Sequence, residues 1–190
     1  MHYEEKLEEF LETMRKQQKL NAVNRQLEKL YLLDPMIDIF NRRGFYQSVE
    51  QKLDENEYKY FTAVSIDMDG LKRINDNFGH NEGDCAITAL GSILTNCAKN
   101  GEICSRFGGD EFNVAIFCNE NPQEHGSEFA KRVRDCVDEY NRTSNRKFKL
   151  EISVGISYDI CGPLLEINEV LGRADSLMYS DKIQRNKARS

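Results

Sequence analysis

Two adjacent carboxylates, Asp110 and Glu111, directly follow the glycine pair Gly108-Gly109 near the middle of the chain. Apolar runs on both sides, over 103–104 and 112–117, predict a β-hairpin with this string at its tip. The glycines suit a turn because they tolerate positive φ and let another group approach the backbone closely. The turn does not require the two acids, which repel each other and suit a divalent cation. An exposed acidic turn is the alternative interpretation.

A second pair of carboxylates lies upstream, where an apolar run over 60–66 predicts a buried strand. The run ends in Asp67-Met68-Asp69-Gly70, so both acids belong to the carboxyl end of that strand. If this strand and the hairpin are neighbours in one sheet, Asp67 and Asp110 can face the same metal ion. Magnesium prefers carboxylate and carbonyl oxygens. Asp69 is expected to be structural and to bond the amides of the following turn.

The chain resembles the GGDEF family, the diguanylate cyclases, in five motifs that follow the family's order over roughly residues 34–185. They are Asp67-x-Asp69-Gly70-Leu71-Lys72-x-Ile74-Asn75-Asp76, Gly79-His80-x-x-Gly83-Asp84, Arg106-x-Gly108-Gly109-Asp110-Glu111-Phe112, Ser153-Val154-Gly155-Ile156 and Ala174-Asp175-x-x-Met178-Tyr179-x-x-Lys182. Ordered motifs are far more specific than one short pattern. The segment over 34–45 is similar to the family's opening motif, except that Ile37 and Asp38 replace its usual Thr-Gly.

The resemblance implies an α/β (α+β) fold with a palm-like central sheet of about five strands flanked by helices, as in class III nucleotide cyclases, preceded by a long N-terminal helix. Residue patterns place strands over 59–67 and 148–157, the hairpin over 103–117, and helices over 44–56, 82–99, 122–140 and 166–182. The implied activity is the condensation of two GTP into cyclic di-GMP with loss of two pyrophosphates. In each phosphoryl transfer, a 3′-hydroxyl attacks an α-phosphate.

The resemblance also assigns metal ligands and catalytic residues. Asp67, the Met68 carbonyl and Asp110 match magnesium ligands, and Glu111 is a further candidate, with two magnesium ions in each site or manganese in their place. Asp110 is the candidate base for the 3′-hydroxyl, and Lys72 would stabilise the charge that develops. The expected catalytic residues are therefore Asp110, Lys72 and Glu111. The alternatives are a hairpin salt bridge for Glu111 and a solvated surface position for Lys72.

Phosphate contacts are expected at two places. The backbone amides of Gly70, Leu71 and Lys72 lead into a helix start, where N–H groups can hold phosphates. Lys182 matches a second phosphate-contacting lysine of the family. A Gly-Arg-Asn string usually follows that lysine, but here the segment is shorter and lacks the glycine. Arg185 therefore departs from the family's pattern.

Asn75 and Asp84 match the family's guanine-binding residues. A carboxylate accepts hydrogen bonds from guanine N1–H and the 2-amino group, whereas an amide can donate to a ring nitrogen or O6. Adenine would leave that carboxylate unpaired, so the pair predicts selectivity for GTP. The other expected substrate contacts are His80, Gly108, Gly109 and Arg106. Arg106 has a structural role as its alternative, and Gly79-His80 can also serve simply to shape a turn.

Residues 1–33 are expected to form a signalling helix ahead of a GGDEF domain over 34–190. Residues 3–33 contain no glycine or proline, and Asp34-Pro35 ends the helix. Two apolar series have the spacing of a coiled-coil seam: Tyr3, Leu7, Phe10 and Met14, then Leu20, Val23, Leu27 and Leu30. They favour a homodimer through this helix, and packing on its own domain is the alternative. In the family, such helices join a sensory domain to the cyclase domain. A longer parent protein could therefore carry sensory or membrane domains.

Composition excludes several classes of protein. A net charge of −6 and a pI of about 5.2 argue against a general nucleic-acid binder, which needs a basic face. The cysteines have no Cys-x-x-Cys spacing, so we expect reduced core thiols in a cytoplasmic protein. No apolar run approaches the ~20 residues of a membrane span, and no signal peptide opens the chain. These residues are expected to make no membrane contact.

An active, GTP-specific, dimeric diguanylate cyclase is the leading hypothesis, because the motif acids are all present. One alternative is a noncatalytic GGDEF domain that binds GTP or cyclic di-GMP as a regulatory module. Another is a scaffold that works through its long helix.

Product inhibition is expected to be weak. The family's Arg-x-x-Asp inhibition motif reads Lys99-Asn100-Gly101-Glu102 in this chain. Lysine cannot offer the planar, two-pronged donor of arginine. The alternative interpretation of this segment is a helix that ends at Lys99 and is capped by Asn100-Gly101.

Overall fold

A mixed five-stranded sheet forms the centre of the computed structural model, which describes residues 2–99 and 101–188. Its strands are β1 (Phe40–Asn41), β2 (Tyr60–Met68), β3 (Ile103–Gly108), β4 (Glu111–Cys118) and β5 (Ile152–Ile160). Their order is β1-β3-β4-β2-β5. β1 runs parallel to β3, and the other neighbouring pairs are antiparallel. The expected sheet of about five strands is confirmed, with β2 and β4 adjacent.

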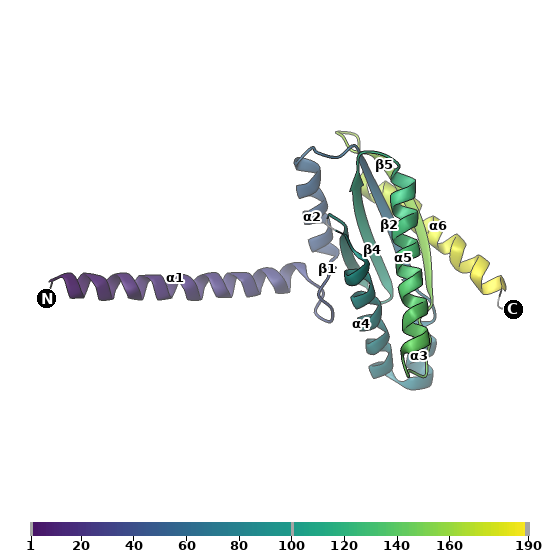
Figure 1. Ribbon diagram of the computed structural model, residues 1–190, viewed down its shortest axis with the longest axis horizontal. Coiled ribbons are helices and arrows are strands. Elements are labelled where there is room, and N and C mark those ends of the chain that lie inside the picture. The colour runs from purple at the N-terminus through teal and green to yellow at the C-terminus, as the bar shows by residue number, and fades with distance from the viewer. Residues whose placement is uncertain (1, 100, 189–190) are drawn as a thin grey trace.

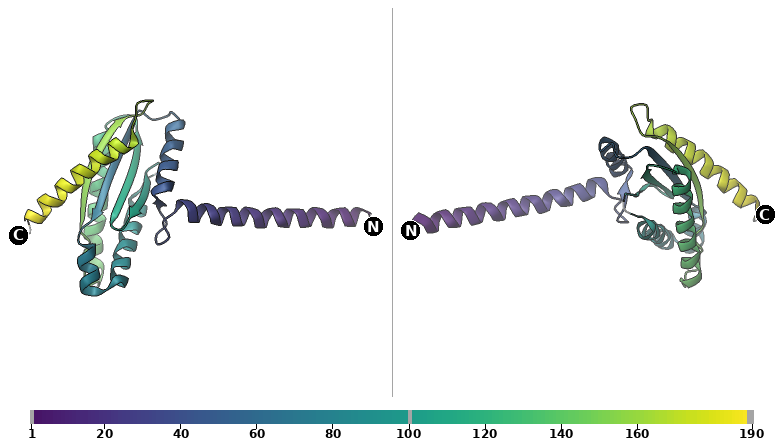
Figure 2. Two further views of the ribbon diagram at one scale, coloured as in Figure 1. Left: turned by 180° about the vertical axis from the view of Figure 1, so that it is seen from behind. Right: turned by 45° about the horizontal axis from the view of Figure 1, so that its top comes forward.

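Helices cover both faces of the sheet. The helices of the chain are α1 (His2–Leu32), α2 (Arg42–Asp54), α3 (Leu71–Phe78), α4 (His80–Cys97), α5 (Pro122–Thr143) and α6 (Ile167–Ala188), and all but α1 cover the sheet. α3, α4 and α5 pack on one face, and α2 and α6 on the other (Figure 1, Figure 2). Val64 of β2 belongs to the first core, and Phe61 to the second. Because β2 is buried on both faces, its sequence is a nearly continuous apolar run.

α1 projects away from the sheet and its covering helices (Figure 1). The seam side chains Leu7, Met14, Leu20 and Leu27 are all exposed, and Leu30 is 77% exposed. Tyr3 and Phe10, which complete the first predicted series, have side chains outside the described part of the structure. The described seam residues therefore do not pack on the domain that follows them.

The junction between α1 and the domain is fixed by Asn41. Its Nδ2 donates to the backbone carbonyls of Tyr31 at 2.9 Å and Leu33 at 3.1 Å. Its Oδ1 accepts from the Gly44 amide at 2.9 Å and caps the start of α2. The Arg43 guanidinium lies 4.0 Å from the centre of the Tyr31 ring. One short polar side chain thus joins the end of α1 to the start of α2.

Several elements differ from the expected bounds. α6 continues six residues beyond the predicted end at 182. β5 begins at Ile152 instead of 148, because the Asn141 side chain bonds both the N–H and the C=O of Leu150, each at 2.7 Å. Gly79, at φ 90°, separates α3 from α4; the sequence predicted a helix start after Gly70 and a helix from 82, but not where the first of these ends. The two-residue strand β1 was likewise not predicted.

All six cysteines are free thiols, as expected for a chain without a disulfide framework. The Sγ atoms of Cys97 and Cys136 lie 3.3 Å apart between α4 and α5. In the described part of the chain, no helix is both long and apolar enough to cross a membrane.

Candidate active site

The two acidic segments meet at one end of the sheet. β2 and β4 pair antiparallel with Asp67 opposite Glu111. The Met68 amide donates to the Asp110 carbonyl at 3.0 Å, so the hairpin tip is bonded directly to the end of β2. The condition for a shared metal site, that these two strands are neighbours, is therefore met. Asp67, Met68, Asp110 and Glu111 thus lie within two rows of one ladder.

Lys182 reaches this acidic end from α6. Its Nζ donates to Asp67 Oδ1 at 2.6 Å and lies 3.9 Å from Asp69 Oδ1. Gly155 of β5 permits the approach of α6, because a Cβ at this position would lie 2.0 Å from the Ala174 carbonyl oxygen. The lysine expected to contact phosphate is therefore paired with the aspartate expected to bind magnesium.

Asp69 is held by a residue that the sequence did not single out for this role. Both carboxylate oxygens of Asp69 accept from the Ser153 hydroxyl, at 2.9 and 3.0 Å. Both residues are buried. Asp69 has the structural role that was expected, but through a serine of β5 instead of the turn amides. Ser153 begins one of the matched motifs, which is the signal that would have located it.

Burial is the main influence on the ionisation of the Asp67 carboxyl group. Burial raises the pKa of Asp67, and nearby Asp110 and Asp69 raise it further, against the hydrogen bond from Lys182 that lowers it. For Lys182, burial acts to lower the pKa, but the hydrogen bond and charge of Asp67 outweigh it and the pKa is raised. Lys182 therefore stays protonated, but its hydrogen bond does not outweigh the burial of Asp67 and the two nearby acids, so the pKa of Asp67 remains raised.

The Arg106 side chain holds the hairpin tip in place through hydrogen bonds. Its Nε and Nη2 both donate to the Gly109 carbonyl, at 3.0 and 2.9 Å, and its Nη1 pairs with Asp34 at 3.2 Å. The tip needs this support because Gly108 and Gly109 both have positive φ, 147° and 52°. The side chains of Arg106 and Asp34 are only 9% and 10% exposed. These contacts agree with the structural alternative for Arg106.

The predicted phosphate-binding turn follows β2. Gly70 adopts the left-handed conformation, with φ 75°, and α3 begins at Leu71. The chain therefore turns back at once, so that the first amides of α3 lie beside the acidic end of β2. Lys72 is exposed on the first turn of α3.

The predicted guanine-binding residues lie on two packed helices. Asn75 is on α3, and Asp84 is exposed on α4, whose first residue is His80. Gly83 makes room for Asn75, because a Cβ at Gly83 would lie 1.9 Å from Asn75 Oδ1. This contact places Asn75 against the turn of α4 that carries Asp84.

The donor set at the acidic end fits magnesium in its chemistry. Carboxylates of Asp67, Asp110 and Glu111 and the carbonyl of Met68 are hard oxygen ligands. Burial, together with the nearby charges of Asp110 and Asp69, raises the pKa of Asp67 and disfavours its ionised form, and a bound divalent cation would favour that form. Within residues 2–99 and 101–188, no three acidic, histidine or cysteine side chains already converge on one metal position.

The segment expected to have lost product inhibition is engaged internally. Both carboxylate oxygens of Glu102 accept from Arg132 Nη2, at 2.7 and 2.8 Å, and one also accepts from the Lys99 amide at 2.8 Å. Asn100, in the middle of the segment, lies outside the described residues. α4 ends at Cys97, so the interpretation that Lys99 ends this helix is wrong by two residues.

This sheet order, with carboxylates at the adjoining ends of its central strands, defines a nucleotide-cyclase-like domain. The chain belongs to the GGDEF family, described as "Diguanylate cyclase, GGDEF domain", whose sequence profile matches residues 31–188.

Named relatives agree with this membership. The chain is 30% identical over 166 residues to the probable diguanylate cyclase DgcC of Escherichia coli. The aligned region covers 86% of this chain and 44% of that protein. It is 27% identical over 166 residues to diguanylate cyclase A of Treponema denticola. That aligned region covers 84% of this chain and 44% of that protein. The chain thus spans less than half the length of these relatives.

A solved structure shows the same fold. It contains the coiled coil and GGDEF domain of DgcB from Caulobacter crescentus in complex with c-di-GMP. The TM-score is 0.77 at 20% identity, and the match covers 92% of this chain and 93% of that one.

Proposed function

We propose that this chain is a metal-dependent, GTP-specific diguanylate cyclase that acts as a dimer. The observation that carries the proposal is the meeting of Asp67, Asp110 and Glu111 at the joined ends of β2 and β4, with Lys182 beside them. Paired carboxylates next to a lysine suit phosphoryl transfer, which requires that negative charge be held and balanced. Membership of the GGDEF family supports the same reaction.

Each group of residues would have a separate task. Asp67, the Met68 carbonyl, Asp110 and Glu111 would hold two magnesium ions, or manganese in their place. When bound, such ions neutralise phosphate charge and favour ionisation of the attacking hydroxyl. Asp110 would accept the proton of the 3′-hydroxyl.

The phosphates would lie between the start of α3 and α6. The amides of Gly70, Leu71 and Lys72 and the side chain of Lys72 would bind their oxygens. Lys182 would bind a phosphate oxygen after it releases Asp67, which requires the single hydrogen bond of 2.6 Å to be exchanged. The glycines of the hairpin tip, Gly108 and Gly109, leave space for the nucleotide, since a Cβ at either would meet no atom within 4 Å.

Guanine would lie between α3 and α4. Asp84 would accept from N1–H and the 2-amino group, and Asn75 would donate to a ring nitrogen or O6. His80 would add a contact at the start of α4. ATP would leave the Asp84 carboxylate without hydrogen-bond donors, and this disfavours the binding of ATP.

The exposed seam of α1 supports assembly into a homodimer, in which each domain would present one GTP to the other. The solved structure from Caulobacter crescentus is described as a coiled coil with a GGDEF domain. Six free cysteines and the use of GTP suit the cytoplasm.

Incubation with GTP and magnesium, followed by chromatography of the products, tests the proposal. We expect cyclic di-GMP and pyrophosphate, and a fall of more than about 100-fold in rate for Asp110→Asn. Glu128→Gln, an exposed acid on α5 away from the site, should retain the full rate. Nucleotide binding without any product would instead support the noncatalytic GGDEF module.

A further inference from the structure

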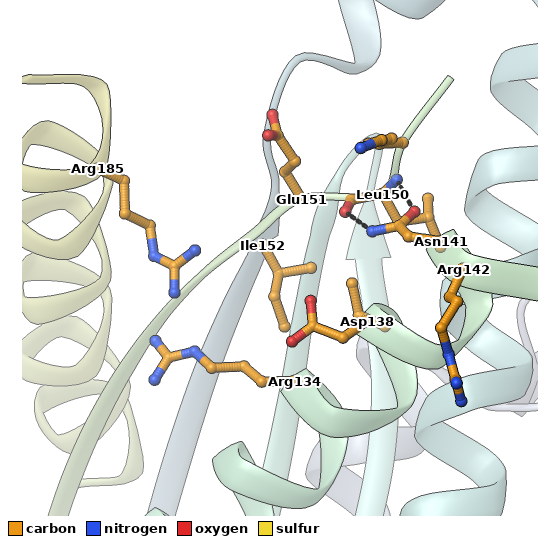
Figure 3. Close-up of a pocket in the computed structure, with 10 residues that line it drawn as sticks. Arg134, Asp138, Asn141, Arg142, Leu150, Glu151, Ile152 and Arg185 are labelled. Atoms are coloured by element: carbon orange, nitrogen blue, oxygen red, sulfur yellow. Dashed lines mark hydrogen bonds between the residues drawn. The ribbon is translucent and has the colours of Figure 1, made fainter. Parts of the chain in front are cut away.

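A cavity of about 490 Å³ lies at the free edge of β5, between α5 and α6 (Figure 3). Four cationic side chains line it: Arg134 and Arg142 from α5, Lys149 from the segment before β5, and Arg185 from α6. Val137, Leu150 and Ile152 add apolar surface. This volume is in the range of small-molecule sites. Its lining includes none of the predicted metal, phosphate or guanine contacts.

Two of the cations converge on one carboxylate. Arg134 Nη2 lies 3.0 Å from Asp181 Oδ2, and Arg185 Nε lies 3.2 Å from the same oxygen. The Val154 amide also donates to Asp181 Oδ2, at 2.9 Å. Figure 3 shows the Arg134 and Arg185 guanidinium groups turned toward each other from α5 and α6. Two guanidinium groups thus share one negative charge that is already bonded to the backbone.

Arg134 also has an unused donor. Its Nε is buried and has no hydrogen-bond partner, and among the described residues it is the one buried side-chain nitrogen or oxygen in this state. Buried polar groups in native proteins are almost always bonded, so such an atom needs an explanation. A tetrahedral anion in the cavity would supply acceptors to the exposed nitrogens of Arg134 and Arg185, because guanidinium groups match phosphate oxygens in geometry, and a turn of the Arg134 side chain would bring its buried Nε to the same anion.

The acids and amide in the wall limit which ligand fits. Glu151 is paired with Arg73 at 3.4 Å, and its carboxylate is directed away from Arg134 in Figure 3. Asn141 is occupied by its two bonds to Leu150. Asp138 presents its carboxylate to the space beside Arg134 (Figure 3). A carboxylate there repels a bare anion but accepts hydrogen bonds from hydroxyl groups.

We propose that this cavity binds a small phosphate monoester that carries hydroxyl groups, as sugar phosphates do. The phosphate lies against Arg134 and Arg185, and a hydroxyl group donates to Asp138. The carbon skeleton covers Leu150 and Ile152. The family's usual glycine after Lys182 is missing in this chain. α6 continues there as a helix, and Arg185 on it lines this cavity.

Calorimetric titration of ribose 5-phosphate into the full chain, in magnesium-free buffer, tests the site. We expect saturable one-to-one binding that Arg185→Gln weakens at least tenfold. Lys182→Gln, three residues earlier on α6, should leave the affinity unchanged, which separates this cavity from the proposed active site. Asp138→Asn should weaken ribose 5-phosphate more than inorganic phosphate.

Any of three results would overturn the proposal. The first is that ribose 5-phosphate does not bind at millimolar concentration, and the second is that inorganic phosphate binds as tightly as the ester. The third is that Lys182→Gln and Arg185→Gln lose affinity for ribose 5-phosphate equally. Arg185→Lys provides a second variant if the glutamine variant does not fold, because it keeps the charge and loses the two-pronged donor. An affinity unchanged in Arg185→Lys would also contradict the assignment. Turnover is not needed for any readout, so these results are independent of the cyclase proposal.

Discussion

Lys182 and Asp67, 115 positions apart in the chain, form an ion pair of 2.6 Å across the boundary between α6 and β2. Each is expected to bind a different part of the substrate complex, phosphate for the lysine and metal for the aspartate. In this structure each is the other's partner. The arrival of metal and nucleotide would therefore exchange one internal ion pair for two external ones, and would free the acidic end of β2.

Magnesium should stabilise the fold through Asp67. The pKa of this carboxyl is raised by burial and by Asp110 and Asp69, so its ionised form is disfavoured in the folded state. The stability that Asp67 contributes is present at low pH and is lost as pH rises through its raised pKa. At neutral pH a bound cation reverses this cost. We expect magnesium at ten times its dissociation constant to add about 1.4 kcal/mol to the free energy of unfolding.

The matched variant is Asp67→Asn, which removes the charge and keeps the shape. It should be no less stable than the wild type without magnesium, and magnesium should no longer raise its melting temperature. Differential scanning calorimetry with EDTA and with magnesium provides the comparison. Equal stabilisation of both proteins by magnesium would place the ion elsewhere.

Gly83→Ala should impair recognition of GTP without unfolding the protein. The new Cβ would lie 1.9 Å from Asn75 Oδ1, so the amide of Asn75 must move from its place between α3 and α4. We expect KM for GTP to rise roughly tenfold or more and discrimination against ATP to fall. Gly172→Ala is the control, since a Cβ at this helical glycine meets no atom within 4 Å. An unchanged KM in Gly83→Ala would show that Asn75 does not contact the base.

Local sequence patterns predicted most of the individual strands and helices, but they did not predict how α6 packs on the sheet. The hairpin, the strand before Asp67 and the adjoining acids follow from apolar runs and turn residues. The Lys182–Asp67 pair depends on the close approach of α6 to Gly155, which only the packed fold reveals. β1, with two residues, is too short for any periodicity to appear.

The structural role of Arg106 was open in the sequence for a related reason. An arginine beside a nucleotide-binding turn suits phosphate as well as it suits a buried acid. Its partner Asp34 is 72 positions away, and the choice depends on where the end of α1 lies. Likewise, Ser153 could not be assigned to Asp69 before β2 and β5 were known to be neighbours.

Asp34→Asn should destabilise the protein in the absence of any nucleotide. It leaves Arg106 charged and without its carboxylate in a site where both side chains are about nine-tenths buried. Loss of one partner of such a pair costs about 3 kcal/mol. Asp38→Asn, an exposed residue of the same segment, should have no effect. Chemical denaturation measures both. If Asp34→Asn changes only KM and leaves stability intact, the arginine acts mainly on substrate.

Leu27→Glu should weaken self-association through α1. Leu27 lies in the second apolar series and is 57% exposed, so the change costs the isolated domain little. In a helical seam the same charge would be buried against its symmetry mate. Sedimentation velocity should show a shift toward monomer, and the rate per enzyme should fall at dilute protein. Gln26→Glu, exposed beside it, should behave as the wild type. Identical sedimentation of all three proteins would exclude α1 as the dimer contact.

Cyclic di-GMP should bind only weakly at the segment Lys99-Asn100-Gly101-Glu102. Glu102 is already engaged by Arg132 and by the Lys99 amide, so a ligand would have to break these bonds before it could use the carboxylate. Lys99 is exposed and offers a point charge instead of the planar fork of arginine.

Product can also compete at the active site, so inhibition of turnover alone does not identify this segment. The informative measurement is a calorimetric titration of cyclic di-GMP into protein saturated with a nonhydrolysable GTP analogue. We expect no submicromolar binding under these conditions, and the same result for Lys99→Ala. Replacement of Lys99 by arginine should increase affinity only if Glu102 can leave Arg132. Submicromolar binding by the wild type that vanishes in Lys99→Ala would show that this segment still recognises the product.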